Sequence, residues 1–104
     1  MTTAHIIKQC RKSLEACYGP RLKGLVLYGS VARNQTVPGS DIDLLVLLDQ
    51  PFDYFEELRR IVDLLYPVQL ESQQLISARP ALWEQYEQGS IQLYRHAKRD
   101  GVLV

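Results

Sequence analysis

The sequence predicts an α/β (α+β) domain, in which a small sheet is flanked by helices. Two apolar runs, residues 25–28 and 42–48, have the length and the residue types of buried strands. Longer segments around them carry apolar residues at every third or fourth position, which is typical of amphipathic helices. A chain of 104 residues, 46% hydrophobic and 23% charged, suffices for one core. We therefore expect residues 1–104 to form a single domain.

Three helices are predicted around the strands. The first covers residues 3–18 and ends at Gly19-Pro20, and the second starts at a capping box of Asp53 and Glu56 and ends at Pro67. The third runs from Pro80 to Gly89 and precedes a short strand over residues 91–94. The residues expected on the buried faces are Ile6, Cys10, Leu14 and Cys17 in the first helix, Phe55, Leu58, Val62 and Leu65 in the second, and Leu82, Trp83 and Tyr86 in the third.

Composition narrows the class of protein. Twelve basic residues balance twelve acidic ones, which argues against nucleic acid as a partner. We expect a cytoplasmic protein, because the chain lacks a signal-like start and an apolar run that could span a bilayer. Cys10 and Cys17 are predicted to be buried thiols, and their spacing suits neither a disulfide nor a zinc site. His5 and His96 lack partner ligands and are read as structural or exposed.

A tight turn is expected where the first strand ends. Gly29 allows the chain to turn without a Cβ penalty, and Ser30 begins a short helical segment. Free backbone N–H groups at such a start favour a phosphate anion, and the Ser30 hydroxyl can add to them. Arg33, one helical turn further on, can reach a phosphate or the next strand, and surface solvation is an equal alternative.

Two carboxylates open the second strand. Strand side chains alternate, so Asp41 and Asp43 share one face, about 6.5–7 Å apart along the strand, while Ile42 points into the core. An isolated pair of this kind is usually a solvated strand end. Here the pair follows a strand, a Gly-Ser turn and a Pro-Gly loop, and Mg²⁺ is commonly held by one or two carboxylates plus substrate phosphates. Asp41 and Asp43 are therefore predicted to be metal ligands.

At these residues the chain resembles the minimal nucleotidyltransferases of the polymerase-β-like superfamily, through residues 29–33 (GSVAR) and 40–46 (SDIDLLV). The resemblance implies a small nucleotidyltransferase fold, with a mixed three- to four-stranded sheet flanked by helices. It also implies two Mg²⁺ ions, ATP as the substrate, and a role as antitoxin to a HEPN-domain ribonuclease toxin. Such antitoxins transfer AMP to a tyrosine of the toxin and also bind it, which makes a homo- or hetero-oligomer the expected form.

The resemblance further implies a third carboxylate on a neighbouring strand. The candidate strand is residues 68–71, after Pro67, where Gln69 and Glu71 share a face. Gln69 stands where an Asp is often found, which leaves Glu71 as a substitute ligand or base with a longer reach. An ordinary exposed acid is an equal reading of Glu71.

The leading hypothesis is a Mg²⁺-dependent enzyme. ATP binds between Gly29, Ser30, Arg33 and the acids Asp41 and Asp43, and attack on the α-phosphate releases pyrophosphate. The rival hypothesis is an inactive antitoxin that neutralises the toxin by complex formation alone, because an obvious third acid is missing and six Tyr and one Trp are available for an interface. Transfer to a small molecule or to RNA has less support, since the neutral chain lacks the basic surface of RNA-modifying members.

Overall fold

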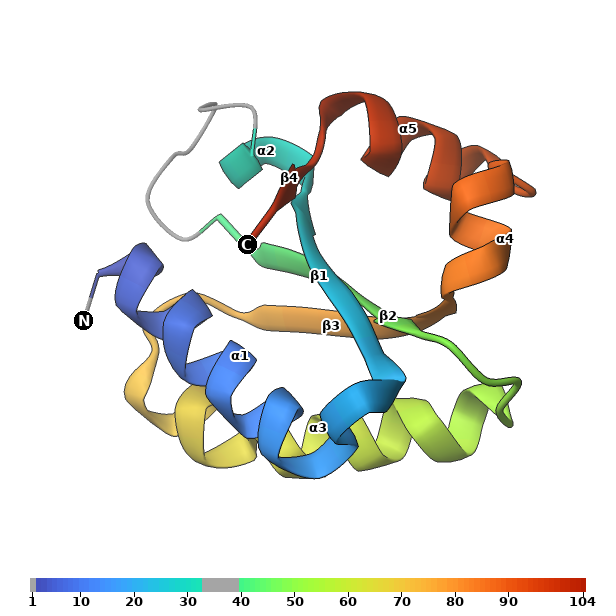
Figure 1. Ribbon diagram of the computed structural model, residues 1–104. Helices are drawn as coiled ribbons and strands as arrows, with labels where there is room; N and C mark the ends of the chain where they lie inside the picture. Colours follow the sequence, from blue (N-terminus) through green and yellow to red (C-terminus); the bar gives the residue numbers. More distant parts are fainter. Residues whose placement is uncertain (1, 33–39) are drawn as a thin grey trace.

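The computed structural model describes residues 2–32 and 40–104 (Figure 1). Within these residues, four strands form one mixed sheet in the order β3-β2-β1-β4, which confirms the predicted α+β fold. Strand β1 runs antiparallel to β2 and β4, whereas β2 and β3 are parallel. The elements in chain order are α1 (Thr3–Tyr18), a 3₁₀ turn (Gly19–Arg21), β1 (Leu22–Tyr28), α2 (Gly29–Ala32), β2 (Ile42–Leu48), α3 (Tyr54–Glu71), β3 (Ile76–Leu82), α4 (Trp83–Gln88), α5 (Gln92–Asp100) and β4 (Val102–Leu103).

Helices α1 and α3 lie side by side and cover one face of the sheet (Figure 1). The predicted stripe of α1 is buried at Ile6, Cys10 and Leu14, but Tyr18 completes it. Cys17 is exposed, so its predicted burial is wrong. The Tyr18 hydroxyl donates a 2.7 Å hydrogen bond to the buried Glu57 carboxylate of α3, which gives this position a polar partner inside the core.

Burial makes the remaining thiol of α1 unreactive. Cys10 is fully buried in the core between α1 and the sheet. This burial raises the pKa of the Cys10 thiol to about 11, because the thiolate would lose its hydration there. Cys10 therefore serves packing.

Helix α3 begins where the sequence predicts but buries a different face. Asp53 caps it by accepting a hydrogen bond from the Glu56 backbone N–H. Phe55 and Val62, predicted to be buried, are 74% and 55% exposed. The sequence-based face is shifted because the pattern gave no reason to bury an acid, whereas Tyr18 supplies a partner for one. The residues that α3 buries are Glu57, Ile61, Leu65 and Val68.

Pro67 does not end α3, contrary to the prediction. The helix continues to Glu71, so residues 68–71 form its last turn and not a strand. Proline removes one backbone donor from a helix. Pro67 lies on the exposed side of α3, where water can satisfy the carbonyl that loses its partner.

The C-terminal third also differs from the prediction. Pro80 lies within β3, and α4 begins at Trp83, although it ends at Gly89 as expected. Proline is tolerated in β3 because this strand is at the edge of the sheet. Residues 91–94 belong to the start of α5 rather than to a strand. Their alternation was misleading, because Leu93, Tyr94 and Ala97 recur at helical spacing and pack on the sheet.

Helices α4 and α5 cover part of the other face of the sheet (Figure 1). Their core is smaller than the one under α1 and α3. Along β2, successive residues alternate between the two cores, with Leu44 and Val46 in the larger and Leu45 and Leu47 in the smaller. No helix in the described ranges is long and apolar enough to cross a bilayer.

Candidate functional site

A row of polar side chains crosses three strands on the face covered by α4 and α5. Tyr28 of β1 is paired with Asp43 of β2, and Asp43 is paired with Ser77 of β3. Neighbouring strands are about 4.8 Å apart, so these three residues are immediate neighbours. Arg79 lies two positions beyond Ser77 and shares its face. Two hydroxyls, a carboxylate and a cation are thereby gathered at one end of the smaller core.

The turn at Gly29 lies directly against the Asp43 carboxylate. Gly29 has a φ of 79°, which confirms that the chain turns where glycine was predicted to be needed. A Cβ added to Gly29 would lie 2.5 Å from Asp43 Oδ2, which is shorter than van der Waals contact. The space for this carboxylate therefore depends on glycine. Ser30 belongs to α2, but its side chain and all of Arg33 lie outside the described part of the chain.

The two acids form a partly desolvated pair of like charges. Asp41 is exposed just before β2, and Asp43 is half-buried. Burial raises the pKa of Asp43, the neighbouring Asp41 raises it further, and the Arg79 guanidinium opposes both. The site thus holds negative charge at an energetic cost, and binding of a cation would relieve that cost.

Gln74 fixes the backbone just before Asp41. Its side-chain amide donates a 2.9 Å hydrogen bond to the Ser40 carbonyl, and its amide oxygen accepts one of 2.8 Å from the Thr3 hydroxyl. Next to this contact, the Ile42 N–H donates to the Leu75 carbonyl at 2.8 Å. The segment that carries Asp41 is therefore held on both sides by the turn between α3 and β3.

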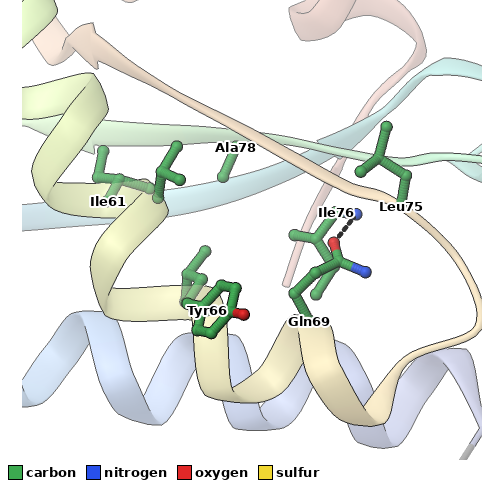
Figure 2. A pocket seen from close by; sticks show the side chains of 8 residues that line it. Ile61, Tyr66, Gln69, Leu75, Ile76 and Ala78 are labelled. Carbon is green, nitrogen blue, oxygen red and sulfur yellow. Dashed lines mark hydrogen bonds between the residues drawn. The ribbon is translucent and has the colours of Figure 1, made fainter.

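Gln69 and Glu71 do not lie on a strand next to β2, contrary to the prediction, because residues 68–71 form the last turn of α3. Glu71 is exposed at the end of α3. Gln69 lines a groove of about 260 Å³ between α3 and β3, where its side-chain oxygen accepts a 2.7 Å hydrogen bond from the Ile76 N–H (Figure 2). Its amide nitrogen donates to the Gln74 carbonyl at 3.0 Å. The Gln69 side-chain amide thus makes an acceptor and a donor hydrogen bond to the backbone at the start of β3, as the backbone of a neighbouring strand would.

The strand next to Asp43 offers a hydroxyl where the third acid was expected. This strand is β3, and the residue beside Asp43 is Ser77. Among residues 2–32 and 40–104, no group of three or more His, Cys, Asp and Glu side chains is placed to hold a metal ion. Two carboxylates together with nucleotide phosphates suit one Mg²⁺ ion. The donors present therefore fit one such ion through Asp41 and Asp43.

Sequence reasoning missed Ser77, Arg79 and Gln74. The alternation of residues 76–81 (ISARPA) is the signal that could have revealed β3. Pro80 concealed it, because proline usually argues against a strand and also suits the first turn of a helix. Gln74 had no detectable signal, since its role depends on contacts with residues distant in sequence.

The nucleotidyltransferase domain family matches residues 7–98, which is most of the chain and includes every residue of this site. The chain belongs to this family. The match confirms the family resemblance that the sequence motifs indicate. The matched residues include the acids Asp41 and Asp43 and the turn after β1.

Relatives and solved structures agree with this assignment. The nucleotidyltransferase is 38% identical over 58 residues to a candidate protein adenylyltransferase of Methanocaldococcus jannaschii, a match that covers 56% of this chain and 58% of the relative. Its fold is similar to that of a candidate nucleotidyltransferase of Sulfolobus solfataricus, with a TM-score of 0.65, 17% identity, and coverage of 95% of this chain and 76% of that one.

Two further structures share the fold and come from toxin–antitoxin complexes. One was solved with AMP-PNP and matches with a TM-score of 0.55 and 19% identity, covering 92% of this chain and 70% of that one. The other is a mutant MntA–HpeT complex, with a TM-score of 0.56 and 18% identity over 99% of this chain and 72% of that one. At these identities the likeness establishes the fold.

Proposed function

We propose that this nucleotidyltransferase is an antitoxin that transfers AMP from ATP to a tyrosine hydroxyl of a partner HEPN-domain ribonuclease toxin in the cytoplasm. The observation that carries the proposal is the packing of the Asp43 carboxylate against the Gly29 turn, with Asp41 beside it. A backbone turn can receive nucleotide phosphates while the acids hold a cation. The family match, the adenylyltransferase relative and the toxin–antitoxin neighbours support the choice of reaction and partner.

The reaction moves one phosphoryl centre between two oxygens. The acceptor oxygen bonds to the α-phosphorus, the bond from that phosphorus to the bridging oxygen of the β-phosphate breaks, and pyrophosphate leaves with the electron pair. The acceptor proton passes to solvent. Mg²⁺, when bound, would neutralise charge on the phosphates. Asp41 and Asp43 would hold the Mg²⁺ ion, and the Gly29 turn leaves room for the phosphates beside these two acids.

The acceptor is expected on another protein because the chain has few elements left to build an acceptor pocket. Strands β1, β2 and β3 and the helices α1, α3, α4 and α5 of the described residues contribute to the two cores. A partner that lies over the site can supply both the hydroxyl and the missing wall of the cleft. This arrangement favours a hetero-oligomer.

A second candidate function is neutralisation by binding alone. Ser77 beside Asp43 favours it, because a serine there supplies neither a third metal ligand nor a strong base. Exposed apolar side chains also offer surface for a partner, and Phe55, Leu70 and Leu103 are 74%, 67% and 72% exposed. In this case the nucleotide site would be retained without transfer.

Intact mass spectrometry distinguishes the two functions. The partner toxin is incubated with this chain, ATP and Mg²⁺, and its mass is compared with that from the Asp41→Asn/Asp43→Asn variant and from Asp63→Asn, which changes an exposed acid on α3. We expect an AMP-sized gain with the unmutated chain and with Asp63→Asn, reduced at least about 100-fold in the double variant. A stable complex with no gain in mass would instead establish neutralisation by binding.

A further inference from the structure

Arg79 is positioned to act on whatever binds at Asp43. It lies one strand over from Asp43 and one side-chain repeat further along β3, on the same face. These steps are about 4.8 Å and about 6.6 Å, which an arginine side chain can span. The Arg79 guanidinium is close enough to interact electrostatically with Asp43 and with Tyr28.

The guanidinium of Arg79 is available to a ligand. Arg79 is exposed, and within residues 2–32 and 40–104 no carboxylate lies within the 4.0 Å of an ion pair with it. Two other arginines, by contrast, are engaged: Arg11 pairs with Glu15 at 2.6 Å and Arg60 with Glu57 at 3.5 Å. A planar, permanently charged group left open beside a nucleotide site is well suited to phosphate oxygens.

Charge balance connects Arg79 with the missing third acid. A two-metal site built from three carboxylates and two divalent cations carries a net charge of plus one. This site has Asp41 and Asp43, and the residue of β3 beside Asp43 is Ser77, which is not a carboxylate. Two carboxylates, one divalent cation and the Arg79 guanidinium also carry a net charge of plus one. The site can therefore offer a nucleotide triphosphate the same charge with one metal ion fewer.

We propose that Arg79 replaces one of the two divalent cations, so that this site binds ATP with a single metal ion and with the Arg79 guanidinium on the phosphates. The proposal rests on the proposed function only in taking ATP as the ligand, and it concerns binding rather than transfer. Ser77 and Arg79 act together in this proposal. A serine at position 77 supplies no carboxylate for a second metal ion, and the Arg79 guanidinium supplies positive charge in place of that ion.

Equilibrium binding tests this proposal without any transfer reaction. The full chain is titrated with α,β-methylene-ATP, which cannot release pyrophosphate, and with Mn²⁺, whose free concentration is followed by electron paramagnetic resonance. The variants are Arg79→Ala, Arg79→Lys, Ser77→Asp/Arg79→Ala and Arg59→Ala. The last removes an exposed guanidinium from α3 and is the matched control. Circular dichroism establishes that each variant is folded.

The unmutated chain and Arg59→Ala are expected to bind one Mn²⁺ per nucleotide with equal affinity. Arg79→Ala should weaken nucleotide binding about 10- to 100-fold, the range for losing hydrogen bonds to a charged group. Arg79→Lys should recover part of this loss, because it keeps the charge and loses the planar fork. Ser77→Asp/Arg79→Ala should bind two Mn²⁺ per nucleotide and recover affinity only at high Mn²⁺ concentration.

Two results would overturn the proposal. One is two Mn²⁺ per nucleotide on the unmutated chain, and the other is unchanged nucleotide affinity in Arg79→Ala. Neither depends on transfer. If the chain binds one Mn²⁺ with the nucleotide through Arg79 but adds no AMP to its partner, the proposed function fails and this proposal stands.

Discussion

The two faces of the sheet are built for different purposes. The face under α1 and α3 is packed with apolar side chains, and Glu57, the one buried charged residue among residues 2–32 and 40–104, has Tyr18 and Arg60 as partners. The face under α4 and α5 has a smaller core, and at one end the row of Tyr28, Asp43 and Ser77 replaces apolar packing. The face under α1 and α3 therefore stabilises the fold, whereas the face under α4 and α5 carries polar and charged side chains in place of part of its apolar core.

Substitutions on the two faces are therefore expected to have different effects on stability and on binding. On the first face, charge is neutralised by partners from the chain itself, which favours the folded state. On the second face, burial and the neighbouring Asp41 raise the pKa of Asp43, and binding of a cation would relieve this cost. Substitutions on the first face should change stability, whereas those on the second should change nucleotide binding. Four experiments test this division, in order of decreasing effect on the free energy of unfolding.

The neighbouring residues Leu44 and Leu45 compare the two cores directly. Both are almost completely buried in β2 and face opposite sides. Leu44→Ala should lower the free energy of unfolding by about 4–5 kcal/mol and Leu45→Ala by about 2–3 kcal/mol, because the smaller core has half-buried neighbours that can close the cavity. Urea unfolding measures both. Equal losses would mean that the two faces contribute alike.

Gly29→Ala should affect both stability and binding. The positive φ alone costs about 1–2 kcal/mol with alanine, and the new Cβ would displace the Asp43 carboxylate. Gly19→Ala is the control, because Gly19 also has a positive φ but nothing lies within 4 Å of its Cβ. Calorimetry should show lower stability for both and weaker binding of Mg²⁺ and ATP only for Gly29→Ala. Weaker binding in both variants would show that the loss arises from general destabilisation.

Gln74→Ala should release the segment before Asp41. It removes the hydrogen bonds to Ser40 and Thr3, at a cost of about 1 kcal/mol, and should weaken cation binding because Asp41 loses its fixed position. Gln73→Ala changes the exposed neighbour and should alter neither property. Metal titration followed by thermal unfolding measures both effects. Unchanged metal affinity in Gln74→Ala would show that these bonds serve the fold alone.

Asp43→Asn should abolish cation binding and yet stabilise the protein slightly. The folded state raises the pKa of Asp43, so it binds the proton more tightly than the unfolded chain does, and stability falls as pH rises above the ordinary value of 3.8. At pH 7 without divalent cations, the variant should gain on the order of 0.5–1 kcal/mol.

The pH dependence provides the check on Asp43→Asn. Urea unfolding at pH 7 and below pH 3.8 should show that the gain disappears at low pH, where the carboxyl is protonated in both states. Asp63→Asn, on the exposed surface of α3, should show no gain at either pH. A loss of stability in Asp43→Asn at pH 7 would contradict the view that this charge is held at a cost.

Local patterns predicted the strands around the site and the start of each long helix. The runs 25–28 and 42–48, the turn at Gly29 and the cap at Asp53 are all present, because each depends on neighbouring residues. The errors lie where distant partners decide. Pro67 continues a helix and Pro80 occupies a strand, since an exposed helix side and a sheet edge tolerate the missing N–H group.

A glycine turn and two acids at the ends of adjacent strands could be predicted from residues 25–48 alone, because strand alternation and turn chemistry are local properties. The residues beside the two acids depend on long-range packing. The pairing of β2 with β3 places Ser77 next to Asp43 and Arg79 within reach, and it leaves Glu71 at the end of a helix. Strand register between segments more than thirty residues apart depends on how the whole core packs, and no short pattern encodes it.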